Sequence, residues 1–353
     1  MQRVYGIDVL RVLSMFMVFM IHNLGQGGVL HEDVSKSSFY IAWILENSGI
    51  VAVNLFALIT GYLLVNRTFK VKRIWDVVVQ ASFWAPVMVA IMVLIGADIN
   101  FKIIIRGVAP IIFQEYWYVS AYIGMMLFSP FVNIGINTLS KNQMTAILCG
   151  ILMASGSIGF IGQWFLLDGY SCIWLLTMYG CGGYIKKYIN NIQNSTKRKL
   201  FIVSLLMCVV SLVAEYYATR IGVSPQRFIS YVSPFVIIQS VSLFVSFKEL
   251  KISPAIGEKL RLIGNLTFGA YLINASCFYD VLRDRLSWTI NYDPLYLVGA
   301  IFGITVAMYV VMLFMEFIRQ ILFNKTGVNR ALDAFYYKLR GYGLEAFRIK
   351  AEI

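Results

Sequence analysis

The sequence predicts an all-α, polytopic integral membrane protein with about ten transmembrane helices and both termini in the cytoplasm. Of its 353 residues, 59% are apolar and 14% are charged, whereas soluble domains carry about 25% charged residues. The mean hydropathy is +0.72. A single soluble core stops growing at about 250–300 residues, so lipid must solvate most of this apolar surface. The lengths of the apolar runs and the distribution of basic residues support the same class.

The chain contains ten apolar runs, most of them near the roughly 20 residues that are needed to cross the hydrocarbon layer. Backbone groups in lipid must be satisfied within their own segment, so each run is predicted to be a helix. A further run, 101–113, is too short to span and is predicted to be a re-entrant or interfacial piece. The predicted spans are 7–25, 42–65, 75–96, 116–136, 144–161, 171–187, 200–218, 229–247, 263–282 and 295–322.

Basic residues predict the orientation of these helices. With the N-terminus inside, 23 of the 30 lysines and arginines fall in cytoplasmic segments, as the positive-inside rule requires. No small-residue cleavage site follows the first run, so we expect it to be retained as a transmembrane helix. Residues 1–325 are predicted to form the transmembrane domain. Residues 326–353 form a basic amphipathic cytoplasmic tail that we expect to lie on the inner leaflet.

The net charge of +12 could indicate a nucleic-acid-binding protein. The charges, however, lie in short clusters between apolar runs, which favours topology determinants and no nucleic-acid partner. The five cysteines lie within apolar runs and form no CxxC pair, and the chain has two histidines. We therefore expect no disulfide framework and no metal site.

The first predicted helix carries Asp8, Arg11 and His22. His22 follows Arg11 by eleven positions. At about 100° and 1.5 Å per residue, this spacing places both on one face, about 16 Å apart along the axis. Asp8 lies within i,i+3 reach of Arg11. Arg11 could instead extend to the inner headgroups, and His22 could be a structural, hydrogen-bonded residue. Ionisable groups at this depth are costly, which favours a functional role for His22.

Other polar residues within or beside the spans are candidates for a site or for helix–helix hydrogen bonds. Glu46 lies near the outer end of the second predicted span and Asn54 lies near its middle. Glu115 and Trp117 precede and open the fourth span. Thr267, Tyr271 and Asn274 share one face of the ninth span by their spacing of four and three residues.

The loop after the second span carries Arg67, Lys70, Lys72 and Arg73. Four cations within seven residues at the inner surface suit a phosphate-rich ligand. Attraction to anionic lipid explains them equally well.

These residues together resemble a known family. The opening YGIDVLRVLSMFMVFMIH, then NLFALITGYLL and FKVKRIWDV, and later LTFGAYLIN, are similar to the acyltransferase 3 family of membrane O-acyltransferases. The most specific element is an arginine and a histidine separated by ten residues, met here by Arg11 and His22. The family has an RxxR-like basic element after the second span, and Lys70 and Arg73 match it here with a lysine in place of the first arginine. The late histidine of the family is replaced by Asn274, which leaves only hydrogen bonding at that position.

The resemblance implies transfer of an acyl group, usually acetyl, from cytoplasmic acyl-coenzyme A to a hydroxyl of an envelope glycan, an exopolysaccharide or its lipid-linked precursor, in a bacterial cell membrane. His22 would then be the general base, because a neutral imidazole suits proton removal from a hydroxyl. Arg11 would position the donor or stabilise developing charge. Either Glu115 or Glu46 would orient His22 or hold the sugar.

The cations would hold the coenzyme phosphates, and Asp8, Asn54, Trp117, Tyr271 and Asn274 are candidate substrate contacts. The alternative function is a flippase or exporter of a lipid-linked glycan, which performs no acyl transfer. The sequence leaves direct transfer and an acyl-enzyme open, and it leaves a monomer and a homo-oligomer open.

Overall fold

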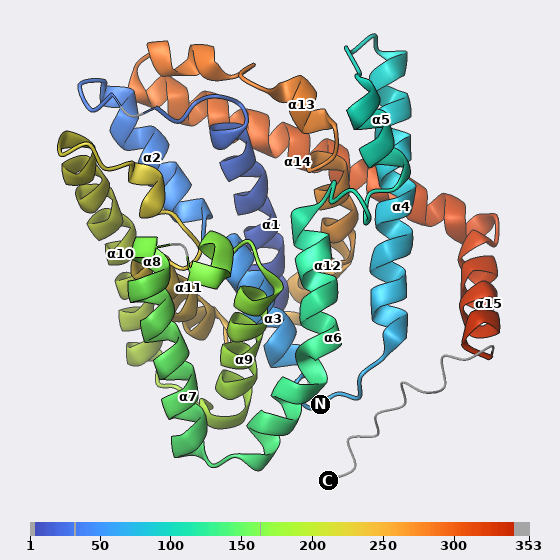
Figure 1. Ribbon diagram of the computed structural model, residues 1–353, viewed down its shortest axis with the longest axis horizontal. Coiled ribbons are helices and arrows are strands. Elements are labelled where there is room, and N and C mark those ends of the chain that lie inside the picture. The colour runs from blue at the N-terminus through green and yellow to red at the C-terminus, as the bar shows by residue number, and fades with distance from the viewer. Residues whose placement is uncertain (1–3, 32, 163, 342–353) are drawn as a thin grey trace.

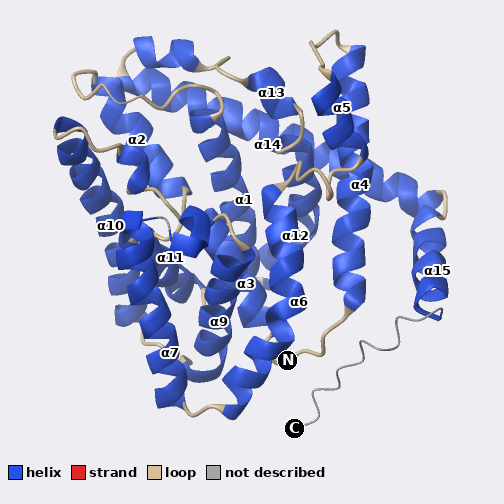
Figure 2. Ribbon diagram, viewed as in Figure 1, coloured by secondary structure: helices blue, strands red, loops and turns tan. Residues whose placement is uncertain are grey.

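The computed structural model describes residues 4–31, 33–162 and 164–341. Throughout these residues the chain is a bundle of helices without β-strands (Figure 1, Figure 2), which confirms the predicted class. The helices are α1 (Tyr5–Gly25), α2 (Ser37–Gly49), α3 (Ala52–Leu64), α4 (Val71–Leu94), α5 (Phe101–Val108), α6 (Trp117–Thr138), α7 (Lys141–Ala154), α8 (Phe160–Gly162), α9 (Cys172–Tyr188), α10 (Asn194–Arg220), α11 (Pro234–Phe247), α12 (Pro254–Asn274), α13 (Phe278–Leu282), α14 (Pro294–Lys325) and α15 (Val328–Gly341).

Seven helical segments among the described residues are long and apolar enough to cross a membrane. They are Tyr5–Gly25, Ser37–Leu64, Val71–Leu94, Trp117–Thr138, Lys141–Gly162, Asn194–Arg220 and Pro294–Lys325. The remaining three predicted spans coincide with α9, α11 and α12, which are also helical. The chain is therefore a multi-pass membrane protein. A total of ten crossings, and the side on which the termini lie, stay predictions.

Some predicted boundaries are wrong for identifiable reasons. The span predicted at 229–247 begins only at Pro234, because proline is favoured in the first turn of a helix. The span predicted at 263–282 begins earlier, at Pro254, since charged residues in its first turns lower the local hydropathy. That helix ends at Asn274, and the short α13 follows it. A turn at residues 50–51 divides the second predicted span into α2 and α3.

Helix α1 occupies the middle of the bundle, where it packs against α12, α3, α14 and α2 (Figure 1). More than half of its residues are buried, including Asp8 and Asn23. Asn23 donates a hydrogen bond to Thr305 of α14 at 3.0 Å. The central position of α1 explains why its polar side chains contact protein.

Helices α3 and α9 approach each other closely at two glycines. A Cβ at Gly61 would lie 1.9 Å from the carbonyl oxygen of Tyr179, and one at Gly182 would lie 2.1 Å from that of Leu58. Small residues at such crossings let two backbones meet, which is a common basis of helix association in lipid. This close contact fixes α3 against α9.

A buried ion pair connects α14 to α4. Both carboxylate oxygens of Glu316 accept hydrogen bonds from Arg319, at 2.5 and 2.8 Å, and Oε2 also accepts one from the Trp84 indole at 2.8 Å. Glu316 is fully buried. A buried carboxylate that has these three hydrogen bonds keeps α4 in a fixed position relative to α14 and α12.

The C-terminal helix α15 packs against the start of α4. Lys72 forms an ion pair with Asp333 at 2.8 Å, and the Trp75 ring lies 5.9 Å from the rings of both Phe335 and Tyr336. Phe335 is about half exposed beside these contacts. The part of the predicted tail that the structure describes, up to Gly341, is thus a helix that packs on α4, and its placement on the inner leaflet stays a prediction. The rest of the predicted tail lies outside the described residues.

Candidate active site

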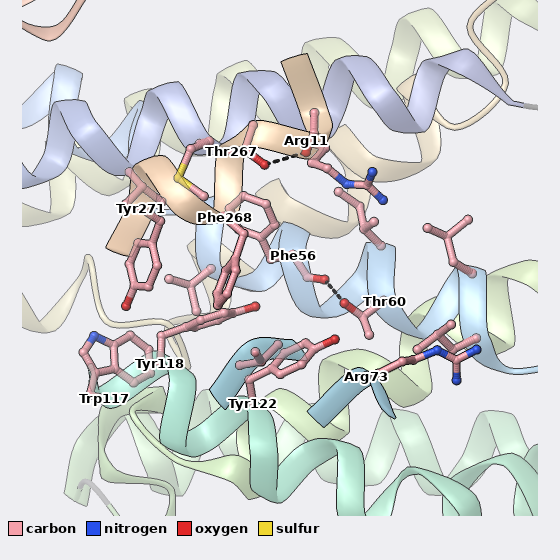
Figure 3. A pocket seen from close by; sticks show the side chains of 18 of the residues that line it. Arg11, Phe56, Thr60, Arg73, Trp117, Tyr118, Tyr122, Thr267, Phe268 and Tyr271 are labelled. Atoms are coloured by element: carbon pink, nitrogen blue, oxygen red, sulfur yellow. Dashed lines mark hydrogen bonds between the residues drawn. The ribbon is translucent and has the colours of Figure 1, made fainter. Parts of the chain in front are cut away.

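A cavity of about 430 Å³ runs between α1, α3, α4, α6 and α12. Its residues include polar groups at both ends and apolar or aromatic side chains between them (Figure 3). The polar and aromatic residues that line it are Arg11, His22, Phe56, Thr60, Arg73, Asp76, Trp117, Tyr118, Tyr122, Tyr231, Thr267, Phe268 and Tyr271. Five helices thus bring together residues that are far apart in the sequence.

Two arginines lie at one end of this cavity. Figure 3 shows the guanidinium groups of Arg11 and Arg73 at the end opposite Trp117 and Tyr271. Arg11 forms an ion pair with Asp8 at 3.7 Å, as its i,i+3 spacing predicts. Arg73 donates a hydrogen bond to the Thr68 carbonyl at 3.1 Å. A guanidinium carries five N–H donors, and the contact with the Thr68 carbonyl occupies one nitrogen of Arg73, so Arg73 can also bind an anionic ligand.

The basic loop contributes less to the cavity than the four-cation cluster suggests. Arg73 lines the cavity, whereas Arg67, Lys70 and Lys72 are not among its lining residues. Arg67 and Lys70 are exposed. Lys72 is held between the carboxylates of Asp76 and Asp333. Arg73 and Arg11 are therefore the cations that can reach a ligand inside.

His22 lines the cavity from α1. Two residues of the C-terminal half, Asn274 and Tyr279, contact its imidazole. Nδ1 of His22 lies 2.7 Å from Oδ1 of Asn274. The Tyr279 hydroxyl donates to the same oxygen at 3.2 Å, and the Tyr279 ring packs edge-on against the imidazole at 4.6 Å. Asn274 is fully buried. His22 and Arg11 therefore share one cavity, as the eleven-residue spacing predicts.

The two carboxylates considered as partners of His22 lie elsewhere. Glu115 forms an ion pair with Arg106 at 3.1 Å, and Arg106 in turn contacts Asp280 at 2.5 Å. Burial raises the pKa of Glu115, which lies on the loop before α6, and the charge of Arg106 opposes this rise. Glu46 is buried in α2 and is not among the cavity-lining residues. The group that holds the imidazole is Asn274.

Other candidate substrate contacts divide into two groups. Trp117 and Tyr271 line the cavity. Asn54 does not: its amide nitrogen donates to the Tyr231 carbonyl at 3.0 Å, and its Oδ1 accepts from the Trp174 indole at 2.8 Å. The amide nitrogen and the amide oxygen of Asn54 are thus both hydrogen-bonded to aromatic residues of the bundle.

Sequence reasoning missed several aromatic residues of the wall. Tyr118 and Tyr122 are four residues apart on α6, a spacing that places them on one face and that could have indicated a shared site. Tyr231 lies in the segment between α10 and α11, where no periodicity signals its position, and Tyr279 lies in the five-residue helix α13. Tyr231 stacks on Trp117 with a centroid distance of 5.9 Å. Long-range packing therefore determines which aromatic side chains reach the cavity.

The arrangement can bind an anionic molecule at the arginine end and remove a proton at the histidine end. Comparison with known families gives a match to an acyltransferase domain over residues 4–315, which is most of the chain. No curated protein and no solved structure matches the sequence. The matched region contains every helix that lines the cavity, and the chain belongs to the acyltransferase 3 family of membrane acyltransferases.

Proposed function

We propose that this membrane acyltransferase moves an acyl group, acetyl in the simplest case, from acyl-coenzyme A to a hydroxyl of an envelope glycan or its lipid-linked precursor. The observation that supports this proposal is the shared cavity, which is lined by Arg11 and Arg73 at one end and by His22 towards the other. The proposed location is the bacterial cell membrane, with the arginine end facing the cytoplasm.

The arginine end suits the phosphates of coenzyme A. A guanidinium forms bidentate, charge-assisted hydrogen bonds with phosphate, which a lysine does not. Arg11 and His22 are separated by about 16 Å along α1, because each residue adds about 1.5 Å. This separation assigns Arg11 to the donor phosphates, since it is too far from the reacting carbonyl to stabilise its charge. The pantetheine arm would lie along the walls formed by Phe56, Val77 and Tyr122.

His22 would act on the acceptor. Its free ring nitrogen takes the proton from the sugar hydroxyl as the oxygen attacks the thioester carbonyl. The tetrahedral intermediate collapses, the carbon–sulfur bond breaks, and the thiolate takes the proton back from the imidazolium. The products are an O-acyl ester and free coenzyme A. The aromatic end, formed by Trp117, Tyr231 and Tyr271, would hold the acceptor ring.

The test uses purified protein in nanodiscs with radiolabelled acetyl-coenzyme A and a panel of lipid-linked sugars. We expect label transfer by the wild type and a loss of about 10²- to 10⁴-fold in kcat for His22→Gln, the range ascribed to a lost general base. Binding of coenzyme A should be unchanged in this variant. The matched control is His31→Gln, which removes the second histidine of the chain, on the loop before α2.

Two results would contradict the proposal. Full transfer by His22→Gln would exclude the general-base role. Movement of the lipid-linked sugar between leaflets without label transfer would assign the protein to the flippase class instead.

A further inference from the structure

The mechanism proposed for His22 requires one particular tautomer of its ring. A neutral imidazole carries its proton on Nδ1 or on Nε2, and the other nitrogen is the base. Which nitrogen carries the proton is set by the hydrogen bond that the ring makes to its neighbours. The partner of His22 therefore decides whether a basic nitrogen is available to the substrate.

The structure assigns Asn274 as the positioning residue that fixes this tautomer. Its Oδ1 lies 2.7 Å from Nδ1 of His22 and has no proton to give, so Nδ1 must be the donor. Nε2 is then unprotonated and lies on the far side of the ring from Asn274. His22 lines the cavity, whereas Asn274 does not. This inference rests on the proposed function, because it explains how the general base is kept in its active form.

Tyr279 is a second hydrogen-bond partner of the Asn274 amide. Its hydroxyl donates to the same Oδ1 at 3.2 Å. If the amide were reversed, Nδ2 would face both the imidazole and the hydroxyl, His22 would have to accept at Nδ1, and Nε2 would carry the proton. The Tyr279 hydroxyl can accept a hydrogen bond as well as donate one, so the ¹⁵N-histidine spectrum distinguishes the two orientations. The edge-on contact of the Tyr279 ring, at 4.6 Å, also restricts rotation of the imidazole.

Among the described residues, the His22 ring contacts the neutral side chains of Asn274 and Tyr279. Tyr279 of α13 packs edge-on against the ring, and Tyr118 of α6 and Tyr271 of α12 are titratable groups that line the same cavity. Arg106 of α5 forms ion pairs with Glu115, on the loop before α6, and with Asp280 of α13. The tautomer of His22 thus depends on a neutral amide, and the helix that carries this amide, α12, packs directly on α1.

The first test reads the tautomer without reading activity. The chain has two histidines, so a His31→Gln protein labelled with ¹⁵N-histidine reports His22 alone. We expect the ¹⁵N shifts and the proton couplings of a ring protonated at Nδ1. In Asn274→Ala, the signals should move toward the Nε2-protonated form or a mixture of both. An Nε2-protonated ring in the unmodified site would overturn the inference, whether or not acyl transfer is detected.

The second test uses kinetics. Asn274→Ala should lower kcat by about tenfold or more, as for other imidazoles that lose their orienting partner, with an unchanged KM for acyl-coenzyme A. Asn274→Asp keeps an acceptor for Nδ1–H and adds a negative charge that favours the protonated ring. This variant should retain activity at alkaline pH, and the acidic limb of its pH–rate profile should move to higher pH.

The matched control is Asn23→Ala. Like Asn274, Asn23 is fully buried, and it donates a hydrogen bond from α1 to Thr305 of the neighbouring helix α14 at 3.0 Å. Its loss should lower the amount of folded protein without moving the pH–rate profile. If Asn274→Ala and Asn23→Ala have the same effect, and Asn274→Asp leaves the profile in place, Asn274 has a purely structural role and the inference is wrong. If the wild type transfers no label while the tautomer test succeeds, the proposed function fails and the positioning of the ring stands.

Discussion

At the scale of the residue, the position of Arg73 differs from that of Arg67 although both belong to the same basic cluster of the sequence: Arg67 lies in the turn before α4, and Arg73 lies in the first turn of α4. Arg73 lines the cavity and Arg67 is exposed outside it. A hydrogen bond to a charged group contributes about 1.5–3 kcal/mol. We therefore expect Arg73→Ala to raise the KM for acyl-coenzyme A about tenfold or more, since each 1.4 kcal/mol corresponds to a factor of ten.

Steady-state kinetics with varied acyl-coenzyme A measures this effect. Arg67→Ala is the matched control and should change KM less than about twofold, because the side chain is solvated. Arg73→Lys should fall between the wild type and Arg73→Ala, since it keeps the charge and loses the bidentate contact. Equal effects of Arg67→Ala and Arg73→Ala would mean that the loop attracts the donor by net charge only.

Individual positions also show how far the sequence predicts the site. The spacing of Arg11 and His22 on one helical face follows from helix geometry, so their shared cavity is predictable from the sequence. Asn54 is not predictable in the same way. A polar residue in a span is satisfied either by a ligand or by another helix, and its neighbours in the sequence do not show which. Its partners, Trp174 and Tyr231, lie more than 100 positions away.

At the scale of the element, the contact of α3 with α9 sets the position of the cavity wall formed by Phe56 and Thr60. Gly61 follows these residues and touches the Tyr179 backbone. Gly61→Ala would place a methyl group 1.9 Å from a carbonyl oxygen, so the helices must separate. We expect a destabilisation of about 1–3 kcal/mol, as for other overpacked contacts.

The matched control is Gly303→Ala on the exposed side of α14, where a Cβ would meet nothing within 4 Å. This change should leave stability unchanged or raise it by about 0.5–1 kcal/mol, because alanine favours the helix. Thermal unfolding in detergent, followed by tryptophan fluorescence, measures both variants. If Gly61→Ala is as stable as Gly303→Ala, then α3 and α9 do not depend on their close approach.

The boundaries of helices were predictable where hydropathy changes sharply along the sequence. They were less predictable where capping residues or charged residues determine where a helix begins. Helix α1 coincides with its predicted span because polar residues follow it directly. Helix α12 begins at Pro254, ahead of Lys259 and Arg261, because helix propensity does not require apolar residues. A hydropathy window therefore finds the part of the helix that lies in lipid and misses the part that extends into water.

At the scale of the whole molecule, the last helix is tied to the entrance of the cavity. Helix α15 reaches the start of α4 through the ion pair of Asp333 with Lys72 and the packing of Phe335 and Tyr336 on Trp75. Arg73 lies between these two α4 residues and lines the arginine end of the cavity. Helix α15, more than 250 positions later in the chain, thus contacts α4 on the two sides of a residue that we propose to bind the donor.

This connection predicts a measurable coupling between Lys72 and Asp333. Both side chains are partly exposed, by 27% and 52%, so water weakens their attraction. Exposed pairs contribute about 0.2–1 kcal/mol, so Lys72→Ala and Asp333→Ala should each raise the KM for acyl-coenzyme A about 1.5- to 5-fold. The double variant should be no worse than either single variant, because the second change removes a partner already lost.

The control is Arg330→Ala, which removes an exposed cation of α15 and should leave the KM for acyl-coenzyme A unchanged. If the effects of the two single variants multiply in the double variant, each residue acts on the donor separately, and α15 does not hold Arg73 in place through this pair.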